Sequence, residues 1–155
     1  MLNLIGEYEC KVDAKGRFMF PTALKKQFGE AFDKGFVINR NLHQKCLVLY
    51  SQDEWQKLNK RLNKLNRLLP KVDAFVRRVL GGATGAEADS TGRVLIPKPL
   101  SEYAHLGTDI KVLGSGNIVE IWDKKSYENF MSLDINMEEL AEDVMGNLNF
   151  GEADE

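Results

Sequence analysis

Residues 12 to 21 read VDAKGRFMFP, and residues 88 to 97 repeat them, little changed, as ADSTGRVLIP. With an offset of 76 positions, identical residues are Asp13 and Asp89, Gly16 and Gly92, Arg17 and Arg93, Pro21 and Pro97, and Leu24 and Leu100. Self-similarity at a fixed offset is the sequence signature of a repeated structural unit. A fold for this chain must therefore accommodate two copies of one small supersecondary unit.

The repeated motif itself is typical of a turn between two strands. Residues 7–12 alternate charged and apolar side chains, which is the period of a half-buried strand. Residues 13–16 then provide turn chemistry, with Gly16 available for a positive φ. Residues 17–20 would return as the second strand. The pattern predicts a β-hairpin.

A short helix and a second hairpin are expected to complete the first unit. Pro21 favours a helix start, and Gly29 a helix end. Residues 36–38 and 46–50 are apolar runs separated by a polar loop, as in a hairpin. The second unit repeats this order in a shorter form, with a turn at 89–92, a strand at 93–96, a helix at 97–105 and a hairpin of 110–113 with 118–122.

Two helices are predicted between the units. Ser51 and Glu54 form a capping box, and apolar residues follow at helical spacing, which predicts a helix over 52–68. Its other positions hold basic residues, and we expect that face to be solvated. Pro70 interrupts the pattern before a second helix around 75–80. The glycine-rich residues 81–85 lack a phosphate-binding Lys and are expected to form a flexible join.

Each unit alone would be a small sheet with one apolar face and exposed edges, in a size range where a single core rarely suffices. Closing two units against each other would bury both faces. We therefore expect an α+β, mainly β fold, in which two βαββ-type repeats related by a pseudo-twofold axis form one barrel with helices outside it.

The charge is unevenly distributed along the chain. The net charge is −2, but residues 134–155 contain eight acidic residues and no Lys or Arg. Residues 1–133 therefore carry 21 basic against 15 acidic residues. A basic body is the electrostatic footprint expected for nucleic-acid binding, although an ordinary solvated surface would have the same composition. We expect the acidic tail to be disordered and solubilising.

Other protein classes find little support in the sequence. No run of about 18 apolar residues predicts a membrane span, and the N-terminus does not resemble a signal peptide, so we expect a cytoplasmic protein. Cys10 and Cys46 fit reduced thiols in a core. His43 and His105 lie in separate units without nearby ligands, and no nucleophile or phosphate-binding motif occurs. We expect no catalytic residue, metal, cofactor, membrane or small-molecule substrate.

Three segments point to a family. GEYECKVDAKGRFMFP, DAFVRRVLGGA and DSTGRVLIP, in this order and spacing, closely resemble the MraZ family of bacterial proteins with two SpoVT/AbrB-type domains. The resemblance covers roughly residues 4–130. It implies a double-split β-barrel, rings of several subunits, and a nucleoid-associated transcriptional regulator. Such a regulator, expected here to be a repressor, binds direct repeats upstream of the division and cell-wall gene cluster that includes its own gene.

The resemblance also implies which residues contact double-stranded DNA. The family's Asp and Arg pair corresponds to Asp13 with Arg17 and to Asp89 with Arg93, and Lys15 fits the first turn. The second turn has no Lys opposite Lys15, so we expect it to contribute less to DNA binding. For Asp13 and Arg17 an ion pair that merely braces the turn is the alternative role, and the two roles can coexist: Asp orients the Arg, and Arg contacts DNA.

The predicted organisation has four parts. Residues 5–51 form the first SpoVT/AbrB-like repeat, 52–82 a helical connection, 83–126 the second repeat, and 134–155 the acidic C-terminal tail. A different class of function stays open: an oligomeric interaction or assembly protein, in which the barrel self-associates and the basic helix binds an acidic partner.

Overall fold

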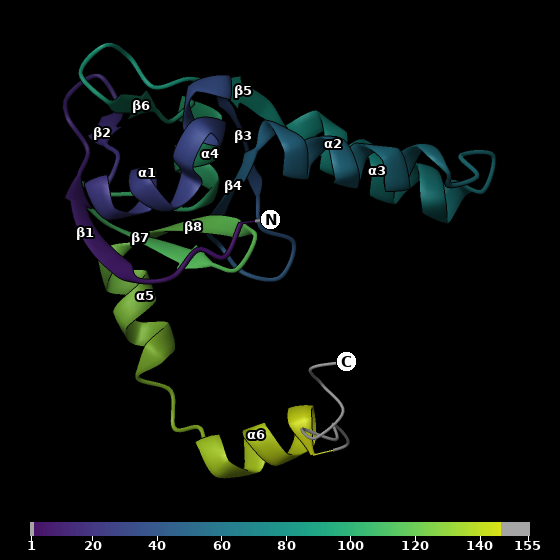
Figure 1. The fold of residues 1–155 in the computed structure, drawn as a ribbon. Helices are drawn as coiled ribbons and strands as arrows, with labels where there is room; N and C mark the ends of the chain where they lie inside the picture. The colour runs from purple at the N-terminus through teal and green to yellow at the C-terminus, as the bar shows by residue number, and fades with distance from the viewer. Residues whose placement is uncertain (1, 147–155) are drawn as a thin grey trace.

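The computed structural model describes residues 2–146 of the chain. Over this range the fold is α+β, as predicted, with mostly antiparallel strands and peripheral helices (Figure 1). In chain order the elements are β1 (Glu7–Lys11), β2 (Arg17–Met19), α1 (Thr22–Phe28), a 3-10 helix η1 (Gly29–Lys34), β3 (Phe36–Arg40), β4 (Leu47–Ser51), α2 (Gln52–Asn63), α3 (Pro70–Gly82), β5 (Thr84–Ala86), β6 (Arg93–Leu95), α4 (Lys98–Tyr103), β7 (Asp109–Ser115), β8 (Ile118–Asp123), α5 (Lys124–Met131) and α6 (Met137–Met145).

The two units interleave in the sheets. A six-stranded sheet has the order β1-β7-β8-β4-β3-β5, and β2 pairs with β6 in a separate two-stranded ribbon. If each strand is exchanged for its counterpart in the other unit, the six-stranded order reads the same from the opposite end. This order is what a pseudo-twofold relation between the units requires. The closed double-split barrel stays a prediction.

The hairpin predicted for β1 and β2 is wrong. The turn between them forms, but only one isolated bridge, Val12 to Phe18, joins the two segments. Beyond it the strands separate, because β1 pairs with β7 and β2 pairs with β6. In the same way β5 pairs with β3 of the first unit. Each unit therefore supplies edge strands to the other, whereas the second hairpins, β3–β4 and β7–β8, form as predicted.

The main core lies between the six-stranded sheet on one side and the β2–β6 ribbon, α1, η1 and α4 on the other. Alternate residues of β3, β4, β7 and β8 point into it, and the second face of β7 and β8 is covered by α5 through a smaller cluster around Trp122. Four phenylalanines stack edge-to-face or in parallel within the core. They are Phe20, which follows β2, Phe28 of α1, Phe32 of η1 and Phe36 of β3. Packing of this kind fixes the β2–β6 ribbon on a rigid base.

Helices α2 and α3 form a two-helix arm that projects from the sheet (Figure 1). Ser51 caps α2 by accepting the Glu54 N–H, as predicted, but the helix ends at Asn63 rather than near 68. Pro70 does not only interrupt the pattern: it is the first residue of α3. The arm has its own apolar core and is anchored where Asn39 donates a hydrogen bond to the Val79 carbonyl at 2.8 Å.

Two predictions for connecting segments are wrong. Residues 84–86 are not a flexible join but strand β5, which extends the sheet beside β3. The tail is not disordered over Met137–Met145, which form α6, and residues 147–155 of the predicted acidic tail lie outside the described residues.

Cys46 is buried and Cys10 half-buried, both as free thiols, which agrees with the predicted core role. None of the helices in the described part is long and apolar enough to cross a membrane.

Candidate nucleic-acid interface

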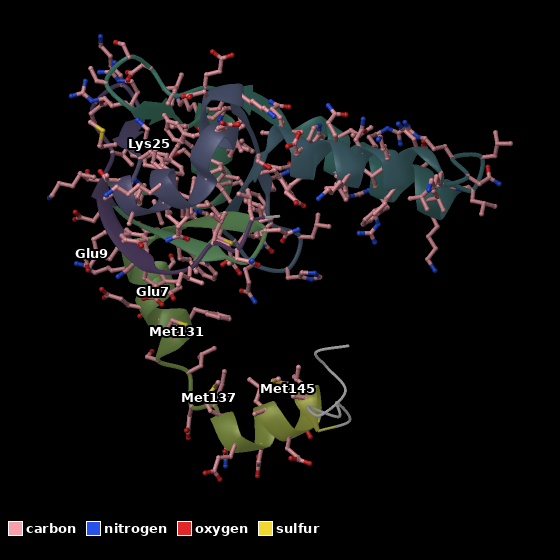
Figure 2. All side chains as sticks on the ribbon, viewed as in Figure 1. Glu7, Glu9, Lys25, Met131, Met137 and Met145 are labelled. Atoms are coloured by element: carbon pink, nitrogen blue, oxygen red, sulfur yellow. The ribbon has the colours of Figure 1, made fainter. Side chains whose placement is uncertain are left out.

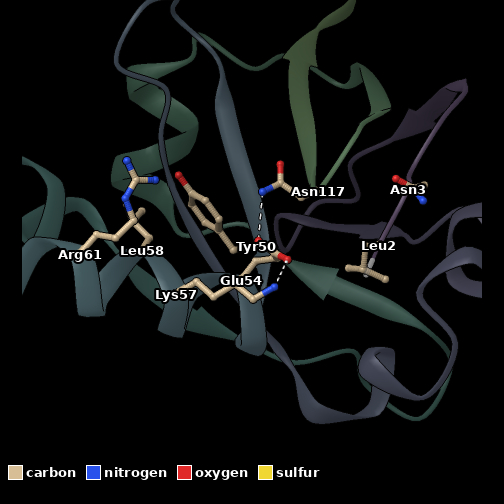
Figure 3. A pocket seen from close by; sticks show the side chains of 8 residues that line it. All are labelled: Leu2, Asn3, Tyr50, Glu54, Lys57, Leu58, Arg61 and Asn117. Carbon is tan, nitrogen blue, oxygen red and sulfur yellow. Dashed lines mark hydrogen bonds and ion pairs between the residues drawn. The ribbon is translucent and has the colours of Figure 1, made fainter. Parts of the chain in front are cut away.

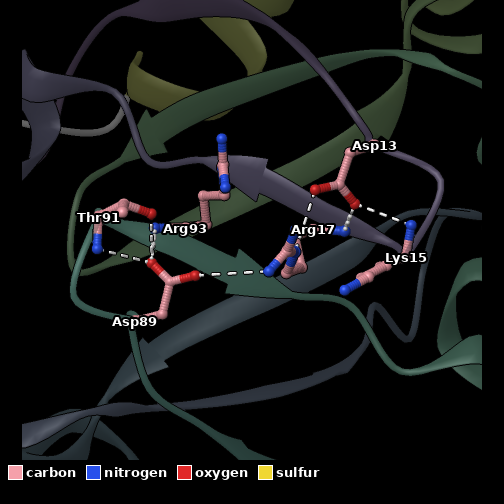
Figure 4. Close-up of polar contacts among 6 residues, drawn as sticks. All are labelled: Asp13, Lys15, Arg17, Asp89, Thr91 and Arg93. Carbon is pink, nitrogen blue, oxygen red and sulfur yellow. Dashed lines mark hydrogen bonds and ion pairs between the residues drawn. The ribbon is translucent and has the colours of Figure 1, made fainter.

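The two copies of the repeated motif lie side by side at one end of the molecule, because β2 and β6 pair directly (Figure 4). The two turns share one backbone design. In the first, the Asp13 N–H donates to the Arg17 carbonyl at 2.8 Å and the Gly16 N–H to the Asp13 carbonyl at 3.0 Å. The equivalent bonds in the second turn have the same lengths. Gly16 and Gly92 have φ of +87° and +89°, which only glycine adopts readily.

Backbone hydrogen bonds also connect each turn to the end of the strand that follows the other turn. The Ile96 N–H donates to the Gly16 carbonyl at 2.9 Å, and the Phe20 N–H donates to the Gly92 carbonyl at 3.0 Å. Each turn therefore holds the end of the opposite strand. The sequence motif, read along one chain segment, gives no sign of this reciprocal contact, which forms only when both units are present.

Asp13 organises the first turn. Its Oδ1 accepts the Lys15 and Arg17 backbone N–H groups, each at 2.9 Å, and its Oδ2 accepts the Arg17 Nε–H at 3.0 Å. Hydrogen bonds from Arg17, first through its backbone N–H, hold the pKa of Asp13 below its usual value. Asp13 is therefore ionised at neutral pH and fixes the base of the Arg17 guanidinium.

Asp89 organises the second turn by a different set of side chains. Its Oδ1 accepts the Arg93 and Thr91 backbone N–H groups, each at 2.9 Å, and the Thr91 hydroxyl at 2.7 Å. The Arg93 backbone N–H, followed by the Thr91 hydroxyl, lowers the pKa of Asp89. Thr91, at the position equivalent to Lys15, thus strengthens the turn where the first unit has a cation.

The two arginines are held differently. Arg17 bridges both turns: its Nε contacts Asp13 at 3.0 Å, and its Nη1 lies 3.9 Å from Asp89 Oδ2 (Figure 4). The Arg93 guanidinium makes no ion pair or hydrogen bond within residues 2–146, although its backbone N–H contacts Asp89. The ion pair considered for Asp13 and Arg17 therefore forms, whereas no equivalent pair of Asp89 with Arg93 forms among residues 2–146. Lys15 is exposed beside Arg17.

The outer face of the β2–β6 ribbon also displays two apolar side chains that the sequence analysis missed. Met19 and Leu95 are 49% and 52% exposed, whereas Phe18 and Val94, which alternate with them, are fully buried. In the antiparallel register Arg17 lies opposite Leu95, and Met19 lies opposite Arg93. The sequence contained a signal for this pair, since Met19 and Leu95 occupy equivalent positions of the repeat, at the same offset of 76.

The arrangement is suited to binding a polyanion with a patterned surface. The ribbon is two strands wide, and it presents two guanidinium groups and two apolar groups diagonally across its face, with Lys15 at its end. Arginine forks match phosphates and the O6 and N7 edge of guanine, and apolar groups match the thymine methyl. Within residues 2–146, no cluster of three His, Cys, Asp or Glu side chains could hold a metal ion.

The chain is similar to known proteins over nearly its whole length. The family model described as "MraZ protein, putative antitoxin-like" matches twice, over residues 4–78 and 79–147. The transcriptional regulator MraZ of Christiangramia forsetii is 51% identical over 97% of both chains, and that of Flavobacterium psychrophilum is 45% identical over 96% of both chains. These relatives are named as regulators of transcription and not as enzymes. A solution structure of PHS018 from Pyrococcus horikoshii covers 77% of this chain and 89% of its own, at 15% identity and a TM-score of 0.33, a likeness too weak to support an argument.

Proposed function

The chain belongs to the MraZ family, whose members are named transcriptional regulators, and we propose that it is a sequence-specific DNA-binding repressor. In this proposal it binds direct repeats upstream of the division and cell-wall gene cluster that includes its own gene, and it is associated with the nucleoid. The observation that supports the proposal most strongly is the pairing of β2 with β6, which sets the two Arg-bearing turns beside each other on one exposed ribbon.

The proposed mechanism assigns a role to each side chain of the ribbon. A two-stranded ribbon is narrow enough to enter the major groove of DNA. Arg17, already oriented by Asp13, would bridge guanine O6 and N7, while Lys15 neutralises a phosphate. Arg93 would contact a phosphate or a second base. Met19 and Leu95 would pack on thymine methyl groups between the two arginines.

Self-association is part of the same proposal. One ribbon offers few base contacts, so a single subunit would bind weakly. If several subunits of a ring engage consecutive repeats, each further contact becomes intramolecular, and avidity can exceed the affinity of one subunit by about a hundredfold or more. Direct repeats in the DNA would then match the spacing of neighbouring subunits.

The test is a gel shift on DNA from upstream of this protein's own gene, with wild type and Arg17→Ala. We expect Arg17→Ala to abolish the specific shift while the melting temperature stays close to that of wild type, because a half-exposed ion pair contributes only about 0 to 1 kcal/mol to stability. Lys71→Ala, an exposed lysine of the arm, is the matched control and should bind normally. Unchanged affinity of Arg17→Ala would remove the ribbon from the DNA interface.

A further inference from the structure

Helix α6 is a well-specified helix that belongs to none of the apolar clusters formed by residues 2–146. Asn136 caps it by accepting the Glu138 and Glu139 N–H groups at 3.0 and 3.2 Å, and both glutamates lie in its first turn, where they favour the helix dipole. Yet none of its residues is buried, and Figure 1 shows it standing away from the sheet and the arm. A nine-residue helix without a partner is marginal in water.

One face of α6 is apolar and exposed. Met137, Leu140, Ala141 and Val144 recur at positions i, i+3, i+4 and i+7, so that they form one stripe. Met137, Leu140 and Val144 are 68%, 41% and 69% exposed. Glu138 and Asp143 flank the stripe, and Glu139 and Glu142 occupy the opposite side. The helix therefore presents an apolar ridge with an acidic border, and Figure 2 shows Met137 and Met145 at its two ends, away from the labelled Glu7, Glu9 and Lys25 of the body.

A groove of matching character lies at the root of the arm (Figure 3). It has a volume of about 610 Å³, and Leu2, Tyr50 and Leu58 provide its apolar lining. Lys57 and Arg61 stand at its border. The one carboxylate in it, Glu54, is already engaged by Lys57 at 3.1 Å and by Asn117 at 3.0 Å. Arg61 has no ion-pair or hydrogen-bond partner through its side chain within residues 2–146.

We propose that the groove binds helix α6 of a second copy of this chain, with the apolar stripe against Leu2, Tyr50 and Leu58 and the acidic border of α6 beside Arg61. This is the mode in which an amphipathic helix lies in an apolar groove, read as i, i+3, i+4 and i+7 anchors. The charges are complementary, since the groove border is basic and the helix is acidic.

A contact of this kind has a consequence for the assembly. Helix and groove are different surfaces of one chain, so each copy can donate a helix to one neighbour and receive a helix from another, which is a heterologous arrangement. Such head-to-tail contacts close into rings when the rotation between neighbours permits. The inference rests on the self-association proposed above and names the surfaces that perform it, but it does not depend on DNA binding.

The test combines two full-length variants that each lose one side of the contact. Leu140→Gln with Val144→Gln removes the apolar stripe and keeps good helix formers, and Arg61→Glu reverses the charge of the groove border. Glu142→Lys, on the far side of α6 and near its C-terminus, where a cation suits the helix dipole, and Lys60→Glu, on α2 outside the groove, are the matched controls. Sedimentation velocity should show self-association weakened by about tenfold or more in both test variants and unchanged in both controls.

Mixing the two test variants separates docking between copies from docking within one chain. The helix variant keeps an intact groove and the groove variant keeps an intact helix, so a mixture should form the contact once per pair and recover a larger species than either variant alone. No recovery on mixing, or association as in wild type for either variant, would overturn the proposal. Gel shifts with Arg17→Ala would still judge the DNA interface separately, because Arg17 lies outside both surfaces.

Discussion

The Asp13–Arg17 turn and the Asp89–Arg93 turn have the same backbone hydrogen bonds and the same glycine conformation, but their side chains are used differently. In the first turn the carboxylate orients an arginine and leaves Lys15 exposed beside it. In the second turn the carboxylate binds a threonine hydroxyl, and the arginine side chain has no partner among the described residues. The two copies share one scaffold, and under the proposed function the first turn contributes more to DNA binding while the second mainly stabilises the ribbon.

The largest expected difference between the turns is in DNA affinity. A bidentate arginine contact to guanine is worth about 1–3 kcal/mol, which corresponds to a factor of about five to 150. Arg17 is pre-oriented by Asp13, whereas Arg93 must lose side-chain freedom on binding, at a cost of about 0.5–1.5 kcal/mol. We therefore expect Arg93→Ala to weaken operator binding by less than Arg17→Ala, as measured by fluorescence anisotropy. Equal losses would contradict the division of roles.

The backbone that the two turns share should respond equally to the same substitution, so that the loss in free energy of unfolding is similar in both turns. Gly16→Ala and Gly92→Ala place a Cβ on a backbone with φ near +90°, at no less than 3.4 Å from any neighbour, so conformation and not collision sets the cost. Each should lower the free energy of unfolding by about 1–2 kcal/mol and the melting temperature by several degrees.

Gly85→Ala is the control for the two glycine replacements, since its Cβ meets nothing within 4 Å and its φ is not positive. Thermal unfolding followed by circular dichroism measures all three variants. A loss at Gly16 alone, with Gly92→Ala as stable as wild type, would show that the second turn can relax and that the two scaffolds are not equivalent.

The same contrast shows what the sequence could and could not predict. Alternation in residues 7–12 and the apolar runs of β3 and β4 identify strands, because the period records which side of a strand is buried. The period does not record the partner strand, which is why β1–β2 was expected as a hairpin although β1 pairs with β7. Strand β5, only Thr-Gly-Ala, has no pattern at all and is specified by its neighbour β3.

The candidate site was predictable to a similar extent. The repeated Asp, Gly and Arg identified the two turns and their backbone chemistry. The bridging of both carboxylates by Arg17 was not predictable, because it depends on the antiparallel register of β2 and β6. Helix α6 was missed for another reason: acidic composition was interpreted as disorder, although the apolar spacing from Met137 to Val144 was present.

A smaller difference is expected from exchanging the residues at the third position of each turn. Lys15→Thr should reduce the salt dependence of DNA binding, and Thr91→Lys should increase it, because each lysine on a phosphate changes the slope of log K against log salt by about 0.9. The affinity itself should change only a few-fold. Titrations between about 50 and 200 mM salt measure both slopes. Thr91→Lys also removes the 2.7 Å bond to Asp89, so a fall in melting temperature for this variant alone would confirm the bracing role of Thr91.

The smallest effect concerns stability in acid. Both turns should lose stability as the pH falls, although different donors lower the pKa of Asp13 and the pKa of Asp89. The pKa values of Asp13 and Asp89 are lowered in the folded state, so each carboxylate stabilises the fold above its unfolded pKa of about 3.9, and this contribution is lost as the pH falls through the folded pKa. Asn at either position keeps one oxygen for the backbone N–H groups but loses the charge and the second acceptor oxygen. The melting temperatures of Asp13→Asn and Asp89→Asn should therefore lie slightly below that of wild type at pH 6; the difference should begin to shrink near the unfolded pKa of about 3.9 and reach its minimum only below the lowered folded pKa.

Glu54 and Asp73 also have lowered pKa values, so the acid sensitivity of wild type alone would not isolate the turns, and the difference from each Asn variant is the quantity to measure. The two variants should then separate at neutral pH in DNA binding. Asp13→Asn releases the Arg17 Nε and should weaken binding, whereas Asp89→Asn removes only a 3.9 Å contact to Arg17 and should weaken it less. If the two variants bound DNA equally well while keeping their matched acid profiles, the orientation of Arg17 by Asp13 would have no part in recognition, and the first turn would brace the ribbon as the second does.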